Sequence, residues 1–283
     1  MKGVAIAHGA ATVINAIATG KGAAFGIGLE TKATVELNAS GKVVAELHGL
    51  KDEDDLLARL CIRSVLDRHA PNQGLGAKVT TSSEIPVSRG LKSSSAAANA
   101  VIMATLQALD VEMDTVEAVR LGTRCAIEAG VSVTGAFDDA CASMLGGLVV
   151  TDNHCDQIIK RMAMPEDLRV IIHVPHSQIR KSGLPLERMR LLSPIIDIAY
   201  QKVLVGKWPE AMIINSLAYS AALSLDPRMT VDAMQQGAVA AGLSGTGPAT
   251  AILVKERRVK AVVEALGGKD FILADIYNGE ELE

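Results

Sequence analysis

The chain has 283 residues, of which 49% are hydrophobic and only 2% aromatic, so its core must be built mainly from aliphatic side chains. The 28 basic and 32 acidic residues give a net charge of −4, which provides no overall attraction to nucleic acid or to an anionic membrane. The four cysteines form no C-x-x-C pair, which argues against the usual zinc and disulfide frameworks. No apolar stretch is long enough to span a bilayer, so no transmembrane helix is expected. These observations predict a cytoplasmic protein and leave its oligomeric state open.

The first half of the chain is predicted to combine strands with helices. Residues 3–17 are small and apolar, and residues 20–28 are rich in glycine and alanine, which suits a turn, a surface that a ligand approaches closely, or tight packing. Residues 32–37 and 42–47 have strand character on either side of a Ser40-Gly41 turn, which predicts a hairpin. Further patterns predict helices over 52–69, 94–108 and 115–129 and strands over 77–82 and 145–150.

A stretch rich in serine connects the predicted strand 77–82 to the predicted helix 94–108. It reads Pro86, Val87, Ser88, Arg89, Gly90, Leu91, Lys92, Ser93, Ser94, Ser95 and Ala96. Small residues that open a helix leave backbone N–H groups free, and the helix dipole adds positive charge, so this stretch favours phosphate binding. An ordinary serine N-cap is the alternative. No G-x-x-x-x-G-K-[ST] motif is present and no G-x-G-x-x-G follows a strand, which excludes a P-loop and gives a dinucleotide fold no support.

Carboxylates gather at the end of the predicted helix 115–129 and just beyond it. Glu128 lies near the helix end, and Asp138 and Asp139 follow a glycine turn, with Asp139 eleven positions after Glu128. Such a set suits magnesium binding and general-base chemistry. Alternatively, Asp138 is only the N-cap of a short helix that runs through Met144.

The polar, proline-containing residues 152–167 are predicted to separate a first subdomain, 1–155, from a second, 156–283. The second half alternates strands with helices, which favours an α+β plait of the ferredoxin-like type. Its predicted strands are 168–174, 250–254 and 271–277, its predicted helices are 184–205 (interrupted at Pro194), 209–223, 229–242 and 256–266, and a polar loop covers 176–183.

A third site candidate is the glycine-rich stretch 241–249. It contains Gly242, Ser244, Gly245, Thr246 and Gly247 and precedes a predicted buried strand. Glycines there permit a ligand to approach the backbone closely. A plain helix-to-strand turn would have the same composition.

Taken in order, the three stretches resemble the motifs of the GHMP small-molecule kinase superfamily, which includes galactokinases, homoserine kinases and mevalonate kinases. The first motif, Pro86 to Ala96, has one residue more than usual between its leucine and its alanine; the last is Gly242 to Ala249. Within the superfamily the chain is most similar to the archaeal type of shikimate kinase. The segments that carry this similarity are 9–16, 90–99, 134–140 and 244–248.

The resemblance implies an α+β GHMP kinase fold, with an N-terminal S5-like α/β part and a C-terminal ferredoxin-like plait. It also implies transfer of the ATP γ-phosphate to the 3-hydroxyl group of shikimate, a step in chorismate and aromatic amino acid biosynthesis, with Mg²⁺ present. ATP would bind the serine-rich stretch together with Gly245, Thr246 and Gly247. Ser95, or a neighbouring serine, would hold Mg²⁺ with Glu128. Asp139 would be the base, since mevalonate kinases use the same eleven-residue spacing, with Asp138 as the alternative.

The substrate side of the predicted site is less defined. Because shikimate carries a carboxylate, its pocket needs a cation. Lys21, Arg180 and Lys181 are candidates by charge and position, and Asn15 is a further candidate contact. Two alternatives stay open: a GHMP kinase for another alcohol, such as homoserine or mevalonate, and a non-catalytic metabolite-binding regulator. Glu128, Asp138 and Asp139, which lie beside an intact phosphate-binding stretch, argue against the regulator.

Overall fold

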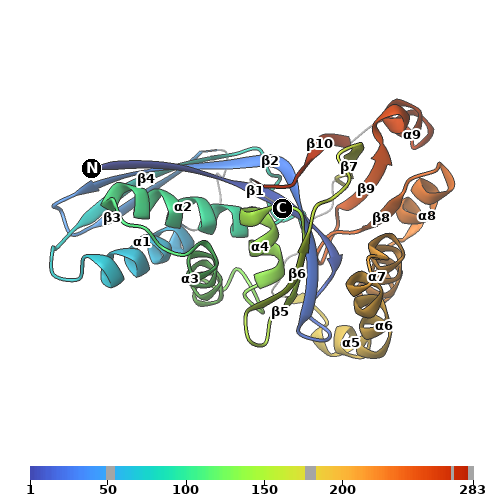
Figure 1. Cartoon of the computed structure of the whole chain (residues 1–283), viewed down its shortest axis with the longest axis horizontal. Helices are drawn as coiled ribbons and strands as arrows, with labels where there is room; N and C mark the ends of the chain where they lie inside the picture. Colours follow the sequence, from blue (N-terminus) through green and yellow to red (C-terminus); the bar gives the residue numbers. More distant parts are fainter. Residues whose placement is uncertain (49–54, 176–182, 269–270, 280–283) are drawn as a thin grey trace.

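The computed structural model describes residues 1–48, 55–175, 183–268 and 271–279. Its strands form one ten-stranded sheet within these residues, in which the main order is β3-β4-β2-β10-β7-β9-β8. Figure 1 shows the sheet running the length of the molecule. The strands are β1 (Lys2–Ile14), β2 (Lys21–Asn38), β3 (Val43–His48), β4 (Gly76–Ser83), β5 (Leu148–Asp152), β6 (Gln157–Met162), β7 (Leu168–His173), β8 (Ala240–Leu243), β9 (Thr250–Lys255) and β10 (Phe271–Tyr277).

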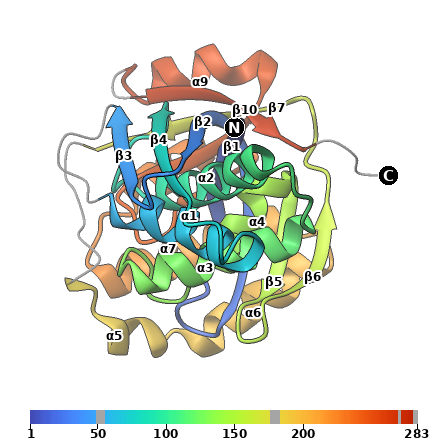
Figure 2. The same ribbon diagram turned by 90° about the vertical axis from the view of Figure 1, so that its left-hand side faces the viewer.

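Helices pack on both halves of this sheet. In Figure 2, α1 to α4 are grouped in the centre, α9 lies at the top, and α5 and α6 lie at the bottom. The helices are α1 (Leu56–His69), α2 (Ser93–Leu109), α3 (Thr115–Glu128), α4 (Phe137–Leu145), α5 (Leu186–Arg190), α6 (Ser193–Leu204), α7 (Trp208–Leu223), α8 (Arg228–Gln235), the 3₁₀ helix η2 (Glu256–Arg258) and α9 (Val259–Ala265). No helix in the described part of the chain is both long and apolar enough to cross a membrane.

The core of the first half explains its composition of small residues. The alanine-rich helix α2 packs closely on β1, and a Cβ at Gly3 would lie only 2.0 Å from the carbonyl oxygen of Ala104. Side chains larger than alanine would hold the helix away from the strand. The small residues of 3–17 therefore serve tight packing, and most of them belong to β1, which pairs antiparallel with β2.

Strand β10 joins the two halves of the sheet. Residues 271–275 pair with β7, and Ile276 and Tyr277 pair with β2. Strand β6, which follows the predicted boundary at residue 155, pairs with β5 of the first half. The division into 1–155 and 156–283 stays a prediction.

The predicted hairpin between 32–37 and 42–47 is wrong. Strand β3 pairs in parallel with β4, and β4 pairs antiparallel with β2, so β4 lies between the two runs. Helix α1 makes the crossover that a parallel pair requires. Strand character and a nearby turn identify two strands correctly, but they do not determine which strands are neighbours.

Two further elements differ from prediction. The predicted helix 229–242 divides into α8 and the buried strand β8, because Gly237 takes a left-handed backbone conformation (φ +86°) that ends the helix. Within the predicted boundary region 152–167, residues 157–162 form β6, whose side chains are mostly exposed or half-buried. An exposed strand lacks the apolar alternation by which strands are recognised.

Candidate active site

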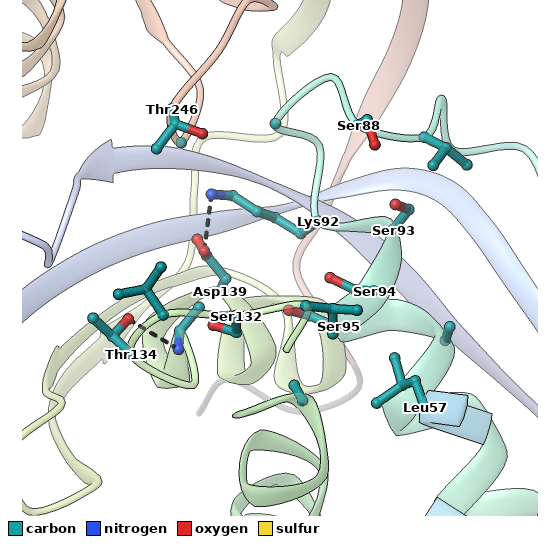
Figure 3. A pocket seen from close by; sticks show the side chains of 18 of the residues that line it. Leu57, Ser88, Lys92, Ser93, Ser94, Ser95, Ser132, Thr134, Asp139 and Thr246 are labelled. Atoms are coloured by element: carbon teal, nitrogen blue, oxygen red, sulfur yellow. Dashed lines mark hydrogen bonds and ion pairs between the residues drawn. The ribbon is translucent and has the colours of Figure 1, made fainter. Parts of the chain in front are cut away.

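A cavity of about 480 Å³ lies between the end of β1, the start of α2, the α3–α4 connection and the loop after β8. Figure 3 shows it from close by. We call residues 85–95 the serine loop and residues 244–248 the glycine loop. The predicted site residues that line the cavity are Asn15, Val87, Ser88, Gly90, Lys92, Ser93, Ser94, Ser95, Asp138, Asp139, Gly245, Thr246 and Gly247.

The start of α2 has the geometry expected of an anion site. Lys92 is the N-cap residue in a left-handed conformation (φ 67°) and makes no capping hydrogen bond with its side chain, so the simple serine N-cap is wrong. The N–H of Ala96 bonds back to the carbonyl of Lys92 at 3.0 Å. The N–H groups of the three preceding serines therefore come before the first intrahelical bond of α2. Figure 3 shows these serines on one side of the cavity, across from Asp139.

An ion pair connects the serine loop to the carboxylates. The Nζ of Lys92 lies 2.8 Å from Oδ2 of Asp139, and both side chains are only 10% exposed. Oδ1 of Asp139 is buried and has no hydrogen-bond partner in the described structure. A buried acceptor without a partner is costly, so an O–H group that reached this oxygen would supply the missing hydrogen bond.

Asp138 lies in a different environment from its neighbour. Its Oδ1 accepts a 2.9 Å hydrogen bond from Nδ2 of Asn153, and its carboxyl group covers Gly22 of β2, where a Cβ would lie 2.4 Å from Oδ2. Burial, and then the charge of Asp139, raise the pKa of Asp138 to about 7. The N-cap of α4 is Ala136, so the N-cap role considered for Asp138 is wrong.

Hydrogen bonds with Thr12 of β1 and with Asn15, which follows β1, hold the glycine loop. The N–H of Gly245 donates to Oγ1 of Thr12 at 2.9 Å, and Nδ2 of Asn15 donates to the carbonyl of Gly245 at 3.0 Å. Oδ1 of Asn15 accepts from the N–H of Ile17 at 2.9 Å. Both ends of the Asn15 amide are thus engaged within the protein, although the residue lines the cavity.

Some predicted site residues do not reach the cavity. Nζ of Lys21 lies 3.5 Å from Asp197, the side chain of Glu128 is exposed at the end of α3, and a guanidinium nitrogen of Arg89 donates to the carbonyl of Pro175 at 2.6 Å. Pro86, Leu91 and Ala96 are also absent from the cavity wall. Arg180 and Lys181 lie outside the described residues. Lys92 is the one cationic side chain among the cavity residues that the structure describes.

Comparison with known proteins identifies the chain. The family model "GHMP kinases N terminal domain" matches residues 56–147. A shikimate kinase of Methanothrix thermoacetophila is 47% identical over 272 residues, which cover 95% of this chain and 92% of that protein. A shikimate kinase of Methanococcoides burtonii is 43% identical over 99% of this chain and 98% of its own length. The chain belongs to the GHMP kinase family, among the archaeal shikimate kinases.

Solved structures confirm the predicted fold of this GHMP kinase. The mevalonate kinase of Methanococcus jannaschii superimposes with a TM-score of 0.76 over 96% of this chain and 98% of that one, at 17% identity. A homoserine kinase of Cytophaga hutchinsonii gives 0.75 over 98% and 96%, at 15% identity. The predicted α+β GHMP kinase fold is confirmed, and membership of the family confirms an ATP-dependent small-molecule kinase.

Sequence reasoning missed several residues of this GHMP kinase site. Thr12 accepts a hydrogen bond from the N–H of Gly245, and Asn153 donates one to Asp138. Thr31, Thr81 and Ser83 line the cavity from β2 and β4. Each lies in an ordinary strand or turn, so no local motif identifies it. Only the tertiary structure brings these residues to the cavity.

Proposed function

We propose that this GHMP kinase transfers the γ-phosphate of ATP to the 3-hydroxyl group of shikimate. The observation that carries the proposal is the Lys92–Asp139 ion pair, which unites a cation of the serine loop with a buried carboxylate at one cavity. The identity of 40–47% to archaeal proteins named shikimate kinase, over more than nine-tenths of the chain, supports shikimate as the acceptor.

The serine loop and the start of α2 are the proposed binding site of the ATP phosphates. Free N–H groups in the first turn, the dipole of α2 and the charge of Lys92 all favour an anion there. The glycine loop adjoins the serine loop and completes the site, and its Gly245 and Gly247 have positive φ angles of 60° and 81°. Glycine permits both that backbone conformation and a close approach of the phosphates.

Asp139 is the proposed base. Phosphoryl transfer depends mainly on positioning and electrostatic stabilisation. Oδ1 of Asp139 would accept the proton of the acceptor hydroxyl as the oxygen attacks the γ-phosphorus, while Lys92 holds Oδ2. Asp138 is the weaker alternative, because its carboxyl group accepts a hydrogen bond from Asn153 and packs against Gly22 of β2.

Magnesium fits this site as a complex with the nucleotide. No group of three His, Cys, Asp or Glu side chains in the described chain could hold a metal ion, whereas Mg²⁺ at kinase sites is held largely by phosphates and water with one or two protein oxygens. The hydroxyl of Ser95 at the cavity wall is such an oxygen, and bound Mg²⁺ would neutralise charge on the phosphates. Glu128, being exposed, is not supported in this role.

The proposed role of Ser95 as a Mg²⁺ ligand is tested by comparing variants of Ser95 and Glu128. Ser95→Ala should raise the Mg²⁺ concentration needed for half-maximal rate roughly tenfold, by loss of one oxygen ligand. Glu128→Gln should leave that concentration nearly unchanged, because its side chain lies outside the cavity. A tenfold rise in the Glu128→Gln enzyme would restore Glu128 as a ligand.

A cation for the shikimate carboxylate is still required. Lys92 serves the phosphates and Lys21 faces Asp197, so we propose Arg180 or Lys181 for this role on the argument of charge alone. Arg180→Met or Lys181→Met should raise the KM for shikimate at least tenfold and leave the KM for ATP near that of the unmodified protein.

The proposed function is tested by ADP release from the purified protein with ATP and Mg²⁺. Parallel reactions contain shikimate, homoserine or mevalonate. Turnover with shikimate alone supports the proposal. Turnover only with another alcohol would replace the acceptor, and ATP binding without any turnover would favour a metabolite-binding regulator.

A further inference from the structure

Three successive carbonyl groups of the serine loop are held by hydrogen bonds. The bonds run from the Ala249 N–H to the Arg89 oxygen (3.1 Å), from the Ser244 hydroxyl to the Gly90 oxygen (2.8 Å) and from the Ala10 N–H to the Leu91 oxygen (3.4 Å). Two of the three come from the chain around the glycine loop and one from β1. The direction of the peptide groups in the serine loop is therefore set by a segment more than 150 residues away in the sequence.

Ser244 is the one side chain among these three donors. It is fully buried and does not line the cavity. Its oxygen also accepts the N–H of Thr12 at 3.3 Å, so one hydroxyl contacts both the serine loop and β1. The two loops touch here: a Cβ at Gly90, whose φ is +88°, would lie 2.1 Å from the carbonyl oxygen of Ser244.

The direction of these carbonyls matters for binding an anion. In a trans peptide the C=O and the following N–H point in opposite directions. A carbonyl bonded to the glycine loop or to β1 cannot turn its partial negative charge toward a bound phosphate. Loss of the bond at Gly90 would free that peptide to rotate, and rotation would oppose phosphate binding.

We propose that Ser244 is a positioning residue for the nucleotide phosphates. Its hydroxyl fixes the Gly90 peptide while Thr12 fixes the N–H of Gly245, so the serine loop and the glycine loop bind the triphosphate as one unit. The inference rests on the proposed use of ATP. It adds a residue that touches neither the nucleotide nor the acceptor.

The test compares Ser244→Ala with a matched control. Ser143→Ala also removes a fully buried hydroxyl, which accepts from Nδ2 of Asn99 at 3.3 Å and so joins α4 to α2. Both changes delete one oxygen atom and should preserve the fold, which circular dichroism and thermal unfolding check. The probe is the Mg²⁺ complex of a non-hydrolysable ATP analogue, and its Kd is measured by calorimetry.

Ser244→Ala should weaken binding of the analogue about tenfold or more, and Ser143→Ala should change it less than about threefold. Ser244→Thr, which keeps the hydroxyl, should recover most of the affinity. In turnover, Ser244→Ala should raise the KM for ATP and leave the KM for shikimate unchanged. Analogue binding within twofold of the unmodified protein, or equal weakening in the two alanine variants, would overturn the proposal.

The binding measurement needs no shikimate, so it distinguishes failure of the proposed function from failure of the proposed role of Ser244. If the unmodified protein binds the analogue but does not phosphorylate shikimate, the proposed function fails, and the role of Ser244 is still decided by the comparison of Kd values. If the unmodified protein does not bind the analogue at all, the positioning role fails as well.

Discussion

Lys92 and Asp139 form an ion pair of 2.8 Å that is nearly buried and spans the cavity. Each residue comes from the first turn or N-cap of a helix, Lys92 from α2 and Asp139 from α4. A pair withdrawn from water costs desolvation free energy, and breaking it by removing one partner is worse. The pair thus couples the proposed phosphate-binding cation to the proposed base, and mutation of either residue should affect the reaction.

Replacing Asp139 tests the base directly. Asp139→Asn should retain ATP binding and reduce the phosphorylation rate by about 10²–10⁴-fold, the usual contribution of a general base. The measurement is the single-turnover rate at saturating ATP and shikimate, together with the Kd for ATP. Asp232→Asn, which changes an exposed aspartate on α8, is the control and should retain full rate. Full activity in Asp139→Asn would exclude this aspartate as the base.

Replacing Lys92 tests the cation. Lys92→Met keeps the length of the side chain but removes its charge, so the KM for ATP should rise and kcat should fall, each roughly tenfold or more. Because the Lys92 charge lowers the pKa of Asp138, its loss should also shift the pH–rate profile. Lys255→Met, at an exposed pair with Asp167, is the control. An unchanged KM for ATP would contradict phosphate contact by Lys92.

The raised pKa of Asp138 predicts a pH-dependent stability. The folded protein holds this proton up to about pH 7, whereas an aspartate in the unfolded chain has its ordinary pKa of 3.8, so the free energy of unfolding should fall as pH rises between these values. Asp138→Asn cannot ionise and should escape that loss. Its Tm should match the unmodified protein near pH 4 and exceed it at pH 8, by roughly 2–4 °C per kcal/mol recovered. Equal destabilisation at both pH values would refute the assignment.

Gly22 provides the space that Asp138 occupies. A Cβ there would lie 2.4 Å from Oδ2 of Asp138, so Gly22→Ala should force the carboxyl group to move and cost about 1–3 kcal/mol of stability. Gly28→Ala on the same strand is the matched control, since its nearest atom would be 3.5 Å away. Thermal unfolding and kcat compare the two. Similar losses in both variants would point to a general strand effect.

Local chemistry predicts the free N–H groups of the serine loop. A proline, a glycine and successive serines before an alanine-rich helix produce free N–H groups whatever the rest of the chain does. For Asp139, the prediction depends on its spacing from Glu128, which resembles that of mevalonate kinases. The structure supports it on other grounds, because it faces Lys92 while Asp138 faces Gly22 and Asn153.

Partners distant in sequence were not predictable. The position of β4 between β2 and β3 depends on a crossover through α1, and the amide of Asn15 is engaged by the glycine loop. Lys21 has the charge that a carboxylate needs, but it faces Asp197. In each case the sequence shows the local chemistry of the residue, but the neighbour that decides its role comes from another part of the chain.

The strand β10 has a consequence for synthesis of the protein. Strands β1 to β5 emerge from the ribosome long before β10. Strand β10 nevertheless pairs with β2 through Ile276 and Tyr277 and with β7 through residues 271–275. The Ser244 hydroxyl that orients the serine loop also emerges late. A nascent chain that carries the serine loop and both aspartates therefore still lacks the strand that joins its two halves. The serine loop acquires its hydrogen bonds from Ser244 and Ala249 only after those residues have been synthesised.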